Sequence, residues 1–330
     1  MMNQVIKEQA ITFSNRVCKH PAYLNAYKAI EQLERYRGVK AKALLLTGKT
    51  GTGKSFLAEQ IVKSRQSVDT DSLSTHPVLY INIAEGSKTV GAVVSTLLSE
   101  LGSPTPFKGT IAKRMFELNT LMQNMNVELV ILDEVHDWIP KTGVTPKSDI
   151  YLFFKSCLNK WKIPFLFLGT DEAKEVFVEK QLKDRCLPDQ TLTVFTCNGH
   201  KSVTDFGVLL YSLLLTFPRK TEGMNFVNKI TIKGDKTTNN KDKTIYTLIE
   251  SDKSLLLRLC LATKGHMRII SDLLTGCIYL TKEDEVVDIS ILKNAFDAEV
   301  KDRPHGNPFH KLMNLCSVIE ALKKESLYEK

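Results

Sequence analysis

Residues 44–62 read LLLTGKTGTGKSFLAEQIV and contain the pattern G-x-x-x-x-G-K-[ST] between a β-rich run and an amphipathic stretch. A strand, a glycine-rich loop and a helix in that order are the context that this phosphate-binding pattern requires. The glycines let backbone N–H groups surround phosphate oxygens, Lys54 reaches the β and γ oxygens, and Ser55 reaches magnesium. The sequence therefore predicts a site for ATP and Mg²⁺ formed by Gly48, Lys49, Thr50, Gly51, Thr52, Gly53, Lys54, Ser55 and Phe56.

The composition is that of a globular protein. The chain has 330 residues, of which 43% are hydrophobic and 25% charged, and a formal net charge of +8. Its apolar runs, such as residues 208–217, are too short to span a bilayer, and the first residues lack the apolar core of a signal peptide. We therefore expect a cytoplasmic protein without a membrane partner, and the positive charge is compatible with a polyanionic one.

Near-continuous apolar runs alternate with helical patterns over the first part of the chain. This alternation predicts an α/β fold with a parallel sheet flanked by helices. We expect an N-terminal helical segment over 1–40 and the nucleotide-binding core over 41–200. The predicted strands are 44–47, 78–83, 129–134, 165–170 and 191–195.

Beyond residue 200 the strand signal mostly disappears. Four helical patterns predict a smaller helical lid domain over 201–300. A polar insertion near 217–248 is expected to form a loop or a β-hairpin. Helix breakers at Pro304, Gly306 and Pro308 precede renewed helical periodicity, which predicts a C-terminal helical tail over 301–330.

A second motif, LVILDEVHD at 129–137, supplies the carboxylates that act beside a phosphate loop. Its apolar residues predict a buried strand that delivers Asp133 to the magnesium shell and Glu134 to the attacking water. DEVHD also resembles the D-E-x-H box of helicases. Such helicases need a second motor domain with an arginine-rich motif, whereas the residues after 200 offer helices. For His136 we consider a hydrogen-bonding or positioning role and a structural role.

Three further residues are candidates for the site. Thr170 ends the next predicted strand, where its hydroxyl can sense the γ-phosphate through water or cap a helix. Arg185 precedes the last core strand and either stabilises a transferred phosphate in a neighbouring subunit or makes a surface ion pair. Arg268 begins a lid helix, where it either reaches the nucleotide or is a solvated residue.

Together GKTGTGKS, LVILDE, LGTDEA, the arginine of QLKDR and the lid element GHMR resemble the AAA+ superfamily. Within it the chain looks most like the TnsC and TniB regulators of bacterial transposons, through PVLYINIAEGSK, KGT at 108–110, VILDEVHD, FLFLGTDEA and ATKGHMRII. The resemblance covers roughly 20–300. It departs at the insertion near 217–248 and at CLP after Arg185, where the family often has an aromatic residue.

The resemblance implies a bacterial, magnesium-dependent ATPase that oligomerises as a ring or filament on duplex DNA. Its implied partners are transposase subunits and a target-selection protein of the TniQ or TnsD type, alone or with a CRISPR effector. DNA-facing positions of the family match Lys88, Lys108 and Thr110, and the basic patch continues to Lys113 and Arg114. Lysine and threonine donate to phosphate oxygens without demanding a particular base. These residues could also be solvated loop residues.

Two other functions remain open on the sequence. One is a nucleotide-switched scaffold or signalling ATPase that binds proteins and not DNA. The other is a helicase or replication-loading motor, which would unwind or translocate along a duplex.

Overall fold

The computed structural model describes residues 4–65, 67–70, 73–83, 89–138, 147–177, 180–232, 243–300 and 304–329. The chain divides into two compact units. The core unit is Pro21–Thr193, and the lid unit is Met1–His20 together with Val194–Lys330. The start of the chain is thus shared between the units.

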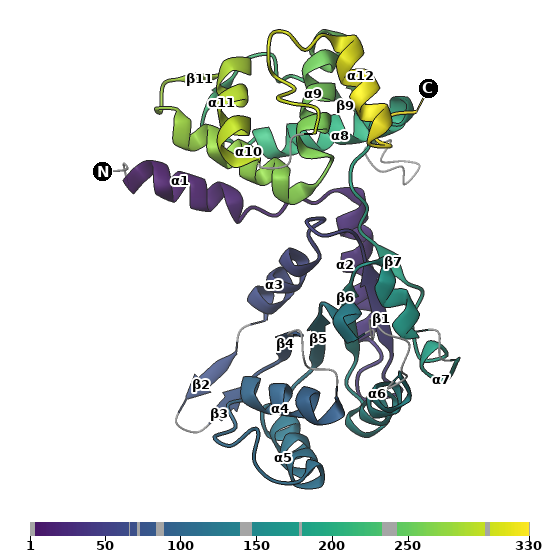
Figure 1. Ribbon diagram of the computed structural model, residues 1–330. Helices are drawn as coiled ribbons and strands as arrows, with labels where there is room; N and C mark the ends of the chain where they lie inside the picture. The colour runs from purple at the N-terminus through teal and green to yellow at the C-terminus, as the bar shows by residue number, and fades with distance from the viewer. Residues whose placement is uncertain are drawn as a thin grey trace, which may run out of the picture. The chain divides into compact units, whose positions relative to one another are not determined.

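Helices and strands alternate along the core unit (Figure 1). Strands Val68–Thr70 and Leu73–Thr75 pair as a small antiparallel hairpin that the sequence pattern did not predict. The elements in chain order are α2 (Pro21–Glu34), β1 (Ala43–Thr47), α3 (Lys54–Ser64), β2 (Val68–Thr70), β3 (Leu73–Thr75), β4 (Val78–Asn82), α4 (Val90–Glu100), α5 (Ile111–Asn124), β5 (Leu129–Asp133), the 3-10 turn Val135–Trp138, α6 (Lys147–Trp161), β6 (Phe165–Gly169), the 3-10 turn Asp171–Phe177, α7 (Lys180–Lys183) and β7 (Gln190–Thr191).

The central sheet has five strands in the order β4-β5-β6-β1-β7, and its pairings are parallel. Every residue of β1, β5 and β6 is buried. Helices on both faces bury a parallel sheet completely, which explains why these strands are continuously apolar and not alternating. The predicted α/β class is confirmed. Strand β6 separates β1, which precedes the phosphate loop, from the acidic strand β5.

Amphipathic helices cover this sheet. Helix α2 contacts β1 and β7, α3 contacts β4 and β6, and α4 contacts β4. On α2 the buried residues are Tyr23, Ala26, Ile30 and Leu33, which recur at helical spacing. Burial of a leucine-sized side chain contributes about 1.5–3 kcal/mol, so apolar contact is the main force that holds these helices on the sheet.

The fifth strand is shorter than its apolar pattern predicts. The pattern predicted residues 191–195, whereas β7 is Gln190–Thr191. Toward the amino end of β7, Pro188 has no N–H to donate to a longer run of hydrogen bonds with β1. On its carboxyl side the chain enters the lid unit at Val194. The strand was therefore predicted in the right place, but its length was wrong.

The lid unit contains the four helices expected after the core, now α8, α9, α10 and α11 (Figure 1). Strands β9 and β10 form an antiparallel hairpin inside the expected insertion, and residues 233–242 between them lie outside the described residues. The elements are α1 (Gln4–Ser14), α8 (Gly199–Leu214), β8 (Lys220–Thr221), β9 (Val227–Ile232), β10 (Lys243–Leu248), the 3-10 turn Glu250–Asp252, α9 (Lys253–Thr263), α10 (Met267–Leu280), β11 (Val286–Val287), α11 (Ile289–Glu299) and α12 (Leu315–Lys324).

Both ends of the chain pack into the lid unit. Helix α1 contacts α10, and α12 contacts α9. The buried Arg219 side chain donates to Thr281 Oγ1 at 3.1 Å and to Gln9 Oε1 at 2.7 Å, which ties α1 to the end of α10. Within the described part of the chain, no helix combines the length and apolar character needed to cross a bilayer.

Candidate nucleotide site

The glycine-rich loop joins β1 to α3 and depends on glycine for its path. Gly51 and Gly53 have φ angles of 80° and 97°, in the left-handed region that side chains disfavour. A Cβ atom on Gly48 would lie 2.3 Å from the backbone oxygen of Leu192, which is too close for any side chain. The loop therefore passes very close to the backbone at Leu192, directly after β7.

The ammonium of Lys54 is buried within this loop. Its side chain is 6% exposed, and Nζ donates to the backbone oxygens of Gly48 at 2.8 Å and Lys49 at 3.2 Å. Burial lowers the pKa of Lys54, while the nearby carboxylates of Glu134, Asp133 and Asp171 act in the opposite direction. The two sequence motifs thus meet at one edge of the sheet, because parallel strands end there together.

The remaining loop residues lie around this lysine. Thr52 is buried and donates from Oγ1 to the backbone oxygen of Lys49 at 2.8 Å, which closes the loop on itself. Thr50 is exposed, and Ser55 and Phe56 are partly buried in the first turn of α3.

Asp133 ends β5 and is completely buried. Its Oδ2 accepts from the Tyr80 hydroxyl at 3.0 Å, and its Oδ1 accepts from the Glu134 N–H at 2.8 Å. Burial, followed by the charge of Asp133, raises the pKa of Tyr80, whose hydroxyl also contacts Ser55. The predicted magnesium ligands Ser55 and Asp133 therefore meet at one tyrosine, and their oxygens fit Mg²⁺.

Tyr80 was missed by the sequence reasoning. It lies in the mostly apolar run VLYINI, which precedes the acidic strand in the sequence. The tyrosine is visible in the sequence, but its contact with Asp133 depends on β4 lying beside β5 in the sheet.

Glu134 follows Asp133 with a φ angle of 58°, in the left-handed region that a side chain rarely adopts. Its Oε2 lies 3.3 Å from Nδ1 of His136. The N–H of Thr170, which follows β6, donates to the same Nδ1 at 3.4 Å. The Thr170 hydroxyl is buried and has no hydrogen-bond partner among the described residues, so it makes no helix cap. Glu134 and Thr170 are thus brought together through His136.

Arg185 lies at the opposite edge of the same sheet. Its backbone oxygen accepts from the N–H of Ala43, the first residue of β1, at 2.9 Å, and its guanidinium donates to Asn159. The phosphate loop follows the other end of β1, roughly 13 Å away at about 3.3 Å per residue. Arg185 is therefore not part of its own chain's phosphate site, and its action on a neighbour stays a prediction.

Arg268 belongs to the lid unit. It lies in the first turn of α10 with its side chain 74% exposed, and its Nε is 3.9 Å from Asp272 Oδ2. Gly265, three residues earlier in GHMR, has a φ angle of 66° and accepts at its backbone oxygen from the Phe195 N–H. A Cβ atom there would lie 1.8 Å from the Phe195 backbone oxygen. Close backbone contact thus explains the glycine, while contact of Arg268 with nucleotide stays a prediction.

We expect Gly265→Ala to lower the free energy of unfolding of the lid by at least ~3 kcal/mol, since the methyl group collides with backbone. Gly306→Ala is the matched control, because Gly306 has a φ angle of 74° and open space around it. That control should cost only about 1–2 kcal/mol, which is the cost of a side chain in the left-handed conformation. Denaturant unfolding of both variants measures the difference, and equal losses would contradict the close-contact explanation.

The predicted DNA contacts differ in what their side chains do. Lys88 lies outside the described residues. Lys108 and Lys113 are exposed before and within α5. Thr110 accepts from the Lys113 N–H and caps α5, whereas Arg114 donates to the Gly91 backbone oxygen at 2.9 Å and so holds α5 against α4.

Two aromatic residues beside these lysines were missed by the sequence reasoning. Phe107 is 74% exposed and Phe116 is 75% exposed. They lie next to Lys108 and in the same helix as Lys113.

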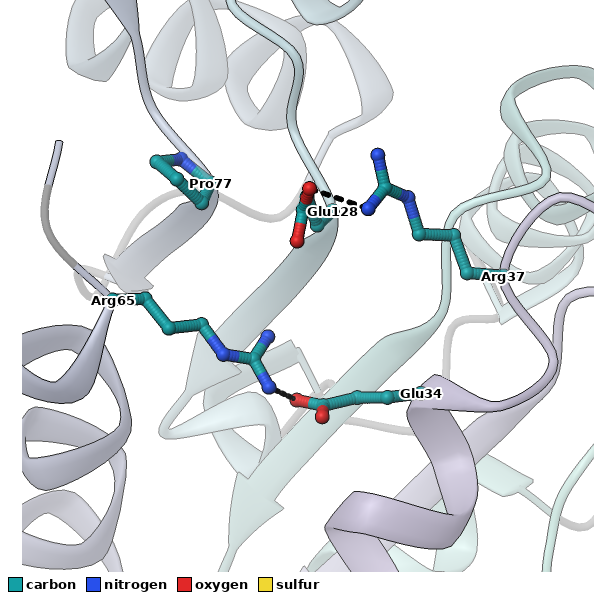
Figure 2. Close-up of a pocket in the computed structure, with 5 residues that line it drawn as sticks. All are labelled: Glu34, Arg37, Arg65, Pro77 and Glu128. Atoms are coloured by element: carbon teal, nitrogen blue, oxygen red, sulfur yellow. Dashed lines mark ion pairs between the residues drawn. The ribbon is translucent and has the colours of Figure 1, made fainter. Parts of the chain in front are cut away.

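A recess of about 480 Å³ lies elsewhere on the core unit, lined by Glu34, Arg37, Arg65, Pro77 and Glu128 (Figure 2). Pro77 and Glu128 directly precede β4 and β5, so the recess is at the amino ends of the strands. Arg37 pairs with Glu128 at 2.5 Å, and Arg65 pairs with Glu34 (Figure 2). Because each guanidinium is compensated by a carboxylate, the recess does not concentrate positive charge for a phosphate.

The family described as "Bacterial TniB protein" matches residues 10–192, which is more than half of the chain. The chain belongs to the TniB family. The matched residues include the whole phosphate loop, β5 with Asp133 and Glu134, and Thr170 and Arg185.

Solved structures show the fold of this TniB-family chain. It is 17% identical to the Aeropyrum pernix ORC1 protein, solved in complex with DNA, over 88% of this chain and 68% of that one, with a TM-score of 0.55. For the ORC2 protein of the same organism, solved with ADPNP and ADP, the identity is 16%, the coverages 87% and 69%, and the TM-score 0.52. Pyrobaculum aerophilum CDC6P is 13% identical, with coverages of 87% and 69% and a TM-score of 0.53. No curated protein matches the chain. The TniB-family chain therefore has the AAA+ fold.

Proposed function

We propose that this TniB-family protein is an ATPase that assembles on duplex DNA and links target-site selection to the transposase during DNA transposition. The observation that carries the proposal is the meeting of Lys54, Asp133 and Glu134 beside the glycine loop. A buried ammonium facing two carboxylates is the charge arrangement that ATP phosphates and a divalent cation require. Family membership supports the role in transposition.

Each residue of the site has a separate task in this proposal. Lys54 neutralises charge on the β- and γ-phosphates, and loop N–H groups orient them. Ser55 and Asp133 would hold Mg²⁺, which when bound neutralises further phosphate charge. Glu134 accepts a proton from the attacking water as general base. The unpartnered Thr170 hydroxyl orients that water.

Two arginines extend the proposed site beyond the phosphate loop. Arg185 would act on the nucleotide of a neighbouring copy, and its position at the far edge of the sheet supports an oligomer, whether ring or filament. Arg268 would contact nucleotide from the lid unit, where its exposed guanidinium is available.

The proposed DNA path runs through Lys88, Lys108 and Thr110. Exposed lysines at the start of α5 support it, because they can approach phosphates without losing an internal partner. Affinity from such contacts arises by counterion release, so it should be nearly independent of sequence and fall steeply with salt. Transposase and a TniQ- or TnsD-type protein are the proposed protein partners.

We expect the double variant Lys88→Ala with Lys108→Ala to flatten the salt dependence of duplex binding. The slope should change by roughly one unit per lost phosphate contact in each protomer. Binding of ATP should be unaffected. The measurement is duplex affinity at several salt concentrations in the presence of ATP and Mg²⁺.

Two control pairs test whether the effect is specific. Lys323→Ala with Lys324→Ala removes exposed charge from α12. Lys241→Ala with Lys243→Ala removes two lysines of the insertion, of which Lys241 lies outside the described residues. These pairs should change the slope much less, because solvated charges are screened within about 8 Å at physiological salt. A wild-type slope in the Lys88 and Lys108 variant, with a loss in a control pair, would contradict the proposed path. Absence of any duplex binding would favour a protein-only scaffold, and strand displacement would favour a helicase.

A further inference from the structure

The contacts of His136 Nδ1 exclude one another. This nitrogen lies 3.3 Å from Glu134 Oε2 and 3.4 Å from the Thr170 backbone nitrogen. A bare Nδ1 can accept the Thr170 N–H but cannot bond a carboxylate, whereas a protonated Nδ1 can donate to the carboxylate but cannot accept. His136 can therefore serve Glu134 or Thr170 at any one time, and not both.

Packing, and not side-chain freedom, sets this geometry. His136 lies in the 3-10 turn Val135–Trp138, which contacts β6 and the turn Asp171–Phe177. A Cβ atom on Gly169 would lie 2.7 Å from Ala173 Cβ and 3.3 Å from Val135 Cγ2. The absence of a side chain at Gly169 thus lets the turns that follow β5 and β6 pack closely, with the His136 ring nitrogen within reach of the Thr170 N–H.

The backbone conformation of Glu134 also supports its contact with His136. Its φ angle of 58° lies in the left-handed region, which residues with a side chain rarely adopt. That conformation places the carboxylate beside His136, with the His136 side chain 20% exposed and that of Glu134 34% exposed. Partial shielding from water strengthens a hydrogen bond between them.

We propose that His136 is the positioning residue of Glu134, and that it exchanges its Nδ1 between Thr170 and the glutamate. With the ring proton on Nε2, Nδ1 accepts the Thr170 N–H and leaves the carboxylate unoriented. With the proton on Nδ1, it donates to Oε2 and directs Oε1 to the water, as a third group orients a catalytic base. The end of β6, where the γ-phosphate would be sensed, is thereby coupled to the base. This inference rests on the proposed ATPase function.

Two amide substitutions separate this role from a structural one. His136→Asn places an amide near the position of Nδ1, whereas His136→Gln places it near Nε2. We expect His136→Gln to lower kcat about 10-fold or more with KM for ATP within about twofold, since an unoriented base loses part of a 10²–10⁴-fold contribution. His136→Asn should retain most of the wild-type kcat.

The affinity for a fluorescent ADP analogue should be equal in the wild type and both variants, which shows that the loop is folded. Equal kcat values in the Asn and Gln variants, or KM rising in step with the fall in kcat, would overturn the inference.

A spectroscopic measurement tests the contact without turnover. Nitrogen NMR of isotopically labelled histidine reports which ring nitrogen of His136 carries the proton. With Mg²⁺ and a non-hydrolysable ATP analogue, we expect the proton on Nδ1 in the wild type and on Nε2 in Glu134→Ala, which has no carboxylate to accept it. If His136 has the same tautomer in the wild type and in Glu134→Ala, the inference is overturned even if the protein hydrolyses ATP. If the tautomer changes in Glu134→Ala but the wild-type protein does not hydrolyse ATP, the contact is supported and the proposed ATPase function is contradicted.

Discussion

Replacing Glu134 by glutamine is expected to lower the rate of ATP hydrolysis by about 100-fold or more while leaving ATP binding intact. The amide keeps the shape of the carboxylate, and the φ angle of 58° at this position is retained, but an amide cannot accept the proton of the attacking water. The variant should therefore remain in its ATP-bound form and accumulate as an oligomer on duplex DNA. Phosphate release and electron micrographs with ATP and DNA measure the two effects.

Glu172→Gln provides the matched control for this prediction. Glu172 is an exposed carboxylate in the turn that follows β6, so its loss removes the same charge from the same region without touching the base. It should hydrolyse ATP normally. Hydrolysis by Glu134→Gln at the wild-type rate would show that the general base has been assigned to the wrong residue.

Replacing Lys54 is expected to weaken ATP binding strongly and to abolish assembly and hydrolysis together. The ammonium is buried and faces the carboxylates of Asp133 and Glu134, so no other donor can replace it from solvent. Lys54→Ala should weaken ATP affinity by about 100-fold, which corresponds to roughly 2.7 kcal/mol. Nucleotide titration measures this loss directly.

Lys54→Met keeps most of the buried volume and removes only the charge, so it separates lost phosphate contact from collapse of the loop. Lys63→Ala, at the exposed end of α3, should bind ATP normally. If Lys54→Met binds ATP as tightly as the wild type, the phosphate-contact role is wrong.

The sheet was predictable because its strands are buried on both faces. Apolar runs of this kind mark their own positions, and β1, β4, β5 and β6 begin and end within a residue or two of the predicted ranges. Strand β7 was predicted less well. Its extent depends on its pairing with β1 and on the passage of the chain into the lid unit, and neither is a local property.

The candidate site likewise contains some residues that the sequence predicted and others that only the structure revealed. Lys54, Asp133 and Glu134 were found because short-range patterns report them: glycines for the loop, and an apolar run ending in carboxylates for the strand. The contact of Tyr80 with Asp133 and that of the Thr170 N–H with His136 required the sheet order, because the partners are 53 and 34 residues apart in the chain. Arg114 was assigned to DNA from its charge, although its guanidinium is used to join α5 to α4.

The sequence by itself determined the local geometry of this protein: a loop that needs glycine at 51 and 53, strands that must be buried, a lysine at the end of the loop, and two carboxylates at the end of a strand. Tertiary structure decided which of these groups meet. The order β4-β5-β6-β1-β7 brings Tyr80 to Asp133 and Thr170 to His136, and the missing side chain at Gly169 sets how closely the last pair approaches. Local patterns carry no information about such contacts, because they follow from the packing of strands that are distant in the chain.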